Sequence, residues 1–396
     1  MNMHLKDLNS GLNSLVIFRD LLSDSVVKAL SEFLSCGGDT VEQINRYSGF
    51  VYELYKETEN LSEYIFRLVL EDENPYIVRR AQGIKTDLLM EECVRNELAA
   101  LQKLSRFTSA EAAACIGYGG FLPKWNTSEL DFAAEYRERA DNVEKYGYGM
   151  YARHKMFIVR DAEIVPVKYP DETRLSQLFS YEEQRKEVVD NTLALIEGRP
   201  AQNVLLYGDA GTGKSSTVKA IVNEYSDRGL RLIEVTKEQL RDLPAIIDSI
   251  SRNPLKFIIF VDDLSFASDD DSFGALKATL EGSVSARARN ICIYATSNRR
   301  HIVKEKFSDR DGDDIHRNDT MQELISLSAR FGLRVNFMKP DKKQYLEIAG
   351  ELAKQNNILI SGDDLAFRAE AFATQGSGRS PRTAKQFIDM LISSSV

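Results

Sequence analysis

The chain has 396 residues, 43% of them hydrophobic, and a formal net charge of −9 at pH 7. This length predicts two or three domains with packed cores, and the negative balance argues against a protein that adheres to nucleic acid through its overall field. Residues 1–25 lack a basic segment followed by an apolar one, and no run approaches about 18 apolar residues. We therefore expect a cytoplasmic protein that does not enter a membrane.

The first 170 residues carry no nucleotide-binding motif, and their pattern is mostly helical. Helical spacing of apolar residues is clearest at 24–34, 51–71 and 87–104. Two short apolar runs, 156–159 and 164–167, have the length of strands in a hairpin. We predict a separate helical domain over residues 1–170 and expect it to bind an unidentified protein partner.

A glycine-rich segment follows, between a predicted strand at 203–207 and a predicted helix at 216–225. It matches the phosphate-binding pattern G-x-x-x-x-G-K-S/T with Gly208, Asp209, Ala210, Gly211, Thr212, Gly213, Lys214 and Ser215. Glycines let backbone N–H groups wrap closely around a phosphate, and the positive end of the next helix faces the same anion. The pattern predicts that Lys214 contacts the β- and γ-phosphates and that Ser215 binds Mg²⁺, with Ser216 continuing the nucleotide-binding segment.

An apolar run at 256–261 ends in two carboxylates, Asp262 and Asp263. In P-loop enzymes a strand of this kind ends beside the phosphates. We predict that Asp262 holds Mg²⁺, directly or through water. Asp263 occupies the position of the group that polarises the attacking water, although Glu is more usual there and Asp reaches about one bond less far.

Three further polar residues complete the candidate set. The strand-like run 291–297 ends at Asn298, whose amide we expect to contact the γ-phosphate or the attacking water. Arg330 precedes a short predicted strand at 333–337, and Arg382 opens a helix near the C-terminus. Both arginines are candidate phosphate ligands.

In this order, these motifs resemble those of an AAA+ ATPase. Within that superfamily, four segments resemble a bacterial family of predicted ATPases catalogued as domain of unknown function 815: residues 203–208, 262–266, 294–301 and 327–333. The resemblance is dense from Leu178 to Phe387 and weaker before it. It implies that the ligands are ATP and Mg²⁺ and that the protein forms a homo-oligomeric ring or arc.

The fold class predicted is α/β, a P-loop NTPase of the AAA+ type. Five predicted strands alternate with helices, as in a doubly wound parallel sheet, near Leu206, Leu232, Ile259, Ile293 and Val335. We place the nucleotide-binding α/β domain at 171–338 and a helical lid at 339–396.

The resemblance also implies roles for individual residues. Asn298 corresponds to the sensor residue that contacts the γ-phosphate, and Arg382 corresponds to the sensor residue in the lid. Arg330 corresponds to the arginine finger, which completes the nucleotide site of a neighbouring subunit. Family members usually carry Asp before that finger, whereas this chain has Ala329. In AAA+ proteins the segment before the first strand lines the adenine pocket, so Leu178 and Tyr181 are candidates there.

The sequence leaves three activities open. The first is a remodelling or loading ATPase that acts on a protein partner. The second is a nucleotide switch with negligible turnover, favoured by Asp263 in place of Glu and by Ala329. The third is a nucleic-acid-associated ATPase, suggested by a cluster of basic residues: Arg287, Arg289, Arg299, Arg300, Lys304 and Lys306. Such a cluster is also what an ordinary solvent-exposed surface would carry.

Overall fold

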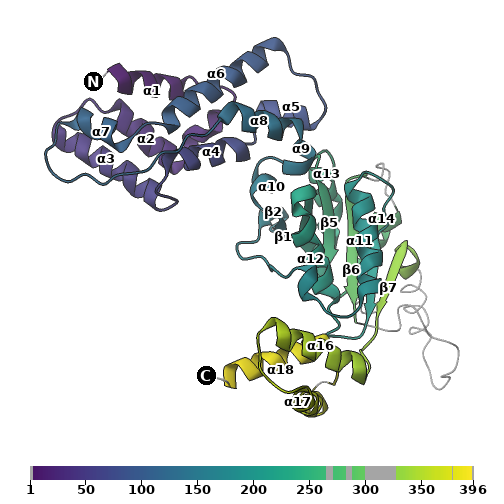
Figure 1. Ribbon diagram of the computed structural model, residues 1–396. Helices are drawn as coiled ribbons and strands as arrows, with labels where there is room; N and C mark the ends of the chain where they lie inside the picture. Colours follow the sequence, from purple (N-terminus) through teal and green to yellow (C-terminus); the bar gives the residue numbers. More distant parts are fainter. Residues whose placement is uncertain (1–2, 265–270, 282–287, 299–326, 377, 395–396) are drawn as a thin grey trace. The chain divides into compact units, whose positions relative to one another are not determined.

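The computed structural model falls into two compact units, Met1–Arg153 and His154–Val396 (Figure 1). The structure describes residues 3–264, 271–281, 288–298, 327–376 and 378–394. The predicted first domain extended to residue 170. The observed boundary lies earlier because the residues after it form a β-hairpin, and the strands of this hairpin belong to the sheet of the second unit.

The first unit is helical. Its elements are α1 (Met3–Asn13), the 3-10 turn η1 (Arg19–Ser23), α2 (Ser25–Ser35), α3 (Thr40–Tyr55), α4 (Leu61–Glu71), α5 (Pro75–Ala81), α6 (Leu88–Ser105), α7 (Ser109–Ile116), α8 (Phe132–Asp141), α9 (Val143–Tyr146) and α10 (Met150–Arg153). Leu, Val, Ile and aromatic residues at helical spacing meet in one core. Trp125 lies in that core, where its indole N–H donates to the Phe107 carbonyl at 2.8 Å.

Short polar residues determine where most of these helices begin. Side chains before the first turn accept hydrogen bonds from its backbone N–H groups at Asp24, Asp39, Asn60, Asn74, Asp87, Thr108 and Asp131. Such caps replace the partners that the first turn of a helix lacks. The helix starts are therefore encoded locally.

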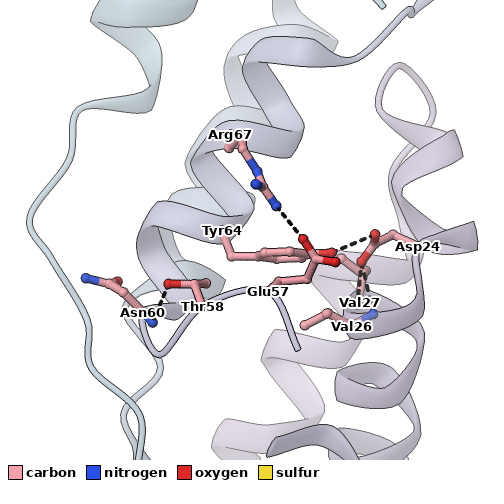
Figure 2. A network of polar contacts seen from close by, with 8 residues as sticks. All are labelled: Asp24, Val26, Val27, Glu57, Thr58, Asn60, Tyr64 and Arg67. Carbon is pink, nitrogen blue, oxygen red and sulfur yellow. Dashed lines mark hydrogen bonds and ion pairs between the residues drawn. The ribbon is translucent and has the colours of Figure 1, made fainter. Parts of the chain in front are cut away.

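Asp24 joins two helices of this unit (Figure 2). Its Oδ1 accepts two hydrogen bonds from the first turn of α2, at 3.0 and 3.1 Å. Its Oδ2 accepts from the Tyr64 hydroxyl of α4 at 2.8 Å. Beside them Arg67 pairs with Glu57 at 3.2 Å, and its guanidinium lies over the Tyr64 ring. One carboxylate thus begins one helix and holds another against it.

Asp24→Ala should therefore destabilise the protein more than loss of an ordinary cap. A lost cap costs about 0.5–2 kcal/mol, and a buried hydroxyl left without its partner adds about 1–3 kcal/mol. Asp39→Ala is the matched control, because the Asp39 carboxylate caps α3 through the Glu42 N–H at 2.9 Å. Urea unfolding followed by the fluorescence of Trp125, the chain's single tryptophan, measures both variants. Equal losses of stability would contradict the joining role of Asp24.

The second unit contains a seven-stranded sheet with the order β2-β1-β4-β5-β6-β3-β7. The strands are β1 (Met156–Arg160), β2 (Glu163–Pro166), β3 (Val204–Gly208), β4 (Leu230–Val235), β5 (Lys256–Val261), β6 (Ile291–Ser297) and β7 (Leu333–Phe337). Neighbouring strands run parallel, except that β2 is antiparallel to β1. The fold is therefore mixed α/β with a mostly parallel sheet.

The sheet is larger than the five strands that the sequence predicted. All five are present, as β3 to β7, and the other two are the predicted hairpin. Its first strand pairs with β4 in parallel, with Met156 opposite Leu232 and Ile158 opposite Glu234. This pairing extends the sheet beyond β4, a long-range contact that a short apolar run does not reveal.

Helices and 3-10 turns surround the sheet: η2 (Leu175–Gln177), α11 (Glu182–Ile196), α12 (Lys214–Tyr225), η3 (Ser226–Arg228), η4 (Lys237–Asp242), α13 (Leu243–Ile250) and α14 (Asp271–Glu281). Val188 of α11 and Ile221 of α12 share a core with alternate strand residues such as Leu206. The intervening residues, such as Leu205 and Ile259, are buried as well. Burial on both faces explains why these strands are continuous apolar runs.

Three helices close the chain: α16 (Lys342–Gln355), α17 (Gly362–Gln375) and α18 (Pro381–Ser394). Tyr345, Phe387 and Ile388 lie in their shared core, against which Phe179 of the preceding linker packs. Asp341 begins α16 with a capping box to Gln344. Within the described ranges, no helix has the length and apolar character needed to span a membrane.

Candidate functional site

The loop between β3 and α12 is shaped by glycines. Gly211 and Gly213 have left-handed φ angles of 78° and 89°. At Gly208, whose φ is 128°, a Cβ would lie 2.3 Å from the Phe337 carbonyl oxygen. The Asp209 N–H donates to that same oxygen at 2.9 Å, which fixes the start of the loop against β7. Close contact with Phe337 thus explains why position 208 requires a glycine.

Lys214 is a buried cation at the start of α12, with 4% of its surface exposed. Its ammonium donates to the carbonyl oxygens of Gly208 and Asp209 at 3.2 and 2.6 Å, and to Asn298 Oδ1 at 3.0 Å. Burial lowers the pKa of Lys214, while attraction to nearby carboxylates, Asp209 first, acts in the opposite direction. The loop and the residue that follows β6 therefore hold a positive charge inside the molecule.

The two acids after β5 meet the loop and β6. Asp262 Oδ1 accepts from the hydroxyls of Ser215 and Thr296, both at 2.6 Å. Asp263 Oδ1 accepts from Asn298 Nδ2 at 2.7 Å, and its N–H donates to Thr296 Oγ1 at 2.8 Å. The φ of Asp263 is 54°, a left-handed conformation that costs a non-glycine residue about 1–2 kcal/mol. These contacts hold that turn in place.

These groups lie around one cavity of about 670 Å³. Its volume is within the range of about 300–1,000 Å³ that is usual for small-molecule sites. Most of the predicted site residues line it: 210–216, Asp262, Asp263, Asn298, Arg382 and Leu178. The Arg382 N–H donates to the Gly211 carbonyl at 3.1 Å, so α18 touches the loop directly.

Two predicted loop residues, Gly208 and Asp209, are not among the described residues that line the cavity. Gly208 ends β3, and the Asp209 carboxylate accepts from the Lys339 N–H at 2.8 Å. Asp209 ties the loop to the chain after β7 through its N–H, which donates to the Phe337 carbonyl, and through this carboxylate. Their roles are structural in this conformation.

Tyr181 is not among the described residues that line the cavity, whereas Leu178, the other residue predicted for the adenine pocket, is. Its ring stacks at 5.4 Å from that of Phe337, and its hydroxyl donates to the Met338 carbonyl at 2.6 Å. Burial, with the nearby Asp209 charge, raises the pKa of Tyr181 to about 12. The residue packs against the end of β7, because the left-handed φ of 63° at Tyr181 turns the chain there.

Arg330 is half-buried and lies just before β7, outside the cavity lining in the described part of the chain. β7 is the last strand at its edge of the sheet. Of the predicted basic cluster, Arg289 is exposed, whereas Arg287, Arg299, Arg300, Lys304 and Lys306 lie outside the described residues.

The structure adds site residues that the sequence reasoning missed. Thr296 bonds both acids, and a signal for it exists: it lies two residues before Asn298, the spacing at which side chains of an extended chain share one side. Lys385 lines the cavity one helical turn beyond Arg382 on α18. Arg185 of α11 lines it too, and burial lowers the pKa of its guanidinium.

Comparison with known families identifies the second unit. The family described as "Protein of unknown function (DUF815)" matches residues 152–395, which is more than half of the chain. The chain belongs to the DUF815 family. Its predicted membership is thereby confirmed, and the match contains every candidate site residue. No curated protein matches the chain.

The site of this DUF815 protein suits a divalent ion that arrives with a phosphate ligand. Among the residues that the structure describes, no group of three His, Cys, Asp or Glu could hold a metal ion. Mg²⁺, however, is usually bound by one or two carboxylates together with substrate phosphates and water. The Ser215 hydroxyl and the Asp262 carboxylate, whose Oδ1 lies 2.6 Å from Ser215 Oγ, provide oxygen ligands of that kind beside the buried ammonium of Lys214. The residues present therefore fit Mg²⁺ together with a nucleotide.

Proposed function

We propose that this protein is a cytoplasmic AAA+ ATPase that binds ATP and Mg²⁺ in the cavity beside the β3–α12 loop. The observation that carries the proposal is the ammonium of Lys214. It is buried, and its three described hydrogen-bond acceptors are neutral oxygens. A buried charge is stable in a protein when an opposite charge accompanies it. The carboxylates of Asp209, Asp262 and Asp263 attract the ammonium, and a phosphate anion in the adjacent cavity would add an opposite charge in direct hydrogen-bond contact.

Four of the polar residues around the cavity have roles at the phosphates in this proposal. Ser215 and Asp262 hold Mg²⁺, which neutralises phosphate charge when it is bound. Asp263 polarises the attacking water and accepts its proton. Asn298 bonds both the ammonium of Lys214 and the carboxylate of Asp263. It therefore holds the phosphate-binding group and the water-activating group in fixed positions relative to each other.

Arg382 couples ATP to the lid formed by α16, α17 and α18. Its side chain lines the cavity, and its N–H is bonded to Gly211 of the loop. A change in phosphate charge at the loop would alter the attraction to this guanidinium. We propose that hydrolysis moves the lid and thereby remodels or loads a protein partner, which binds the helical first unit.

A nucleotide switch with slow turnover is the second candidate. The observation that favours it is the Asp263 carboxylate, which Asn298 engages at 2.7 Å in a strained turn. Steady-state phosphate release separates the two functions, because a switch binds ATP with negligible turnover. Salt-sensitive stimulation by DNA or RNA would point to the nucleic-acid-associated alternative.

Lys214→Ala tests the proposal through ATP affinity. Hydrogen bonds to charged groups contribute about 1.5–3 kcal/mol, so Kd for ATP should rise by about 10- to 100-fold. Lys219→Ala is the matched control, since this lysine of the same helix pairs with Glu234 at 3.2 Å. Calorimetric titration should find Kd raised only in Lys214→Ala. Equal ATP affinity in Lys214→Ala and the parent would refute the assignment of the loop.

A further inference from the structure

Thr296 is a buried residue of β6, 2% exposed, to which the proposed chemistry assigns no role. Its hydroxyl donates to Asp262 Oδ1 at 2.6 Å and accepts from the Asp263 N–H at 2.8 Å. Its carbonyl oxygen accepts from the Leu264 N–H at 2.6 Å. One residue thus bonds three consecutive positions of the turn that follows β5.

The first consequence concerns the Asp262 carboxylate. Three donors converge on its Oδ1: the hydroxyls of Ser215 and Thr296, and the Asp263 N–H at 3.1 Å. Oδ2 accepts no hydrogen bond from the described residues. Because the donors occupy one oxygen, they fix the rotation of the carboxylate and leave the other oxygen for a divalent ion.

The second consequence concerns Asp263. The bond from its N–H to Thr296 Oγ1 holds the left-handed φ of 54°. Asn298 follows directly after β6, two residues beyond Thr296, and bonds the Asp263 carboxylate. Thr296 therefore fixes the backbone of Asp263 while Asn298 orients its side chain.

We propose that Thr296 is a positioning residue that sets Asp262 for divalent-ion binding and Asp263 for activation of water. This inference rests on the proposed function. Thr296 reaches the ion only through Asp262, as partners in the outer shell of a metal site do. Loss of such a partner typically weakens metal affinity or activity by about 10- to 100-fold.

The test is Thr296→Val, which keeps the branched shape and removes the hydroxyl. In the presence of a saturating non-hydrolysable ATP analogue, Mn²⁺ binding measured by electron paramagnetic resonance should weaken by about 10- to 100-fold. Thr296→Ser should restore the affinity, and Thr296→Ala provides a second variant without the hydroxyl. Thr192→Val is the matched control, because that buried threonine bonds the Tyr294 hydroxyl at 2.8 Å and should leave Mn²⁺ affinity at the parent value.

Hydrogen exchange in the nucleotide-free protein supplies a second readout. The amides of Asp263 and Leu264 should exchange faster in Thr296→Val than in Thr296→Ser. Unchanged exchange would show that Thr296 does not hold the turn, and unchanged Mn²⁺ affinity would overturn its positioning role. If the parent binds the analogue normally, these outcomes refute the inference alone. If the parent binds no nucleotide, the proposed function fails and the inference fails with it.

Discussion

Arg330→Ala is expected to lower ATP turnover by about 10³- to 10⁵-fold while leaving the affinity for ATP at the parent value. Arg330 lies outside the cavity lining that the described residues form, next to β7 at one edge of the sheet. We propose that it reaches the γ-phosphate in a neighbouring subunit, where an arginine stabilises charge that develops in the transition state. Arg334→Ala, which removes an exposed arginine of β7, is the matched control and should change turnover far less.

Mixing two inactive variants separates this role from a structural one. Lys214→Ala retains Arg330 but has a defective pocket, and Arg330→Ala retains the pocket but lacks the finger. Mixed oligomers should regain part of the turnover, and light scattering with ATP should detect the oligomer. A monomer with full activity, or an Arg330→Ala variant as active as the parent, would remove the basis of the trans-acting role.

Asp263→Asn is expected to retain ATP and Mg²⁺ and to lose about 10²- to 10⁴-fold in turnover. Asparagine has nearly the same shape and can still accept from Asn298 Nδ2, but it takes up no proton from water. The matched control is Asp248→Asn, which removes one exposed negative charge on α13. Phosphate release and calorimetric binding should separate the two steps. Undiminished turnover in Asp263→Asn would mean that another group activates the water.

Much of the site was predictable because its parts are local. The glycine and lysine spacing from 208 to 215 predicted a loop between a strand and a helix, and β3 and α12 flank that loop in the structure. The apolar runs before Asp262 and Asn298 are neighbouring parallel strands, β5 and β6. Carboxyl ends of parallel strands meet at one edge of a sheet, so the polar residues that follow them converge.

The parts that escaped prediction depend on long-range packing. The hairpin that begins at Met156 joins the sheet because its first strand pairs with β4. The sequence of a five-residue strand does not reveal which sheet the strand joins. The position of Tyr181 follows from a left-handed turn and from contact with Phe337, which is far away in the sequence. Thr296 was within reach of strand alternation, but its role becomes evident only with the 2.6 Å contact to Asp262.

The most direct test of the central claim is to map where ATP protects the backbone of the parent protein. Hydrogen exchange with and without Mg²⁺ and ATP should slow at 210–216, where the backbone N–H groups of the loop bind phosphate. Slower exchange is also expected at 262–264 and 296–298, with the helical unit at 3–153 as the internal reference. ATP-dependent protection confined to 3–153, or no protection at 210–216 with saturating ATP, would contradict the proposed nucleotide site.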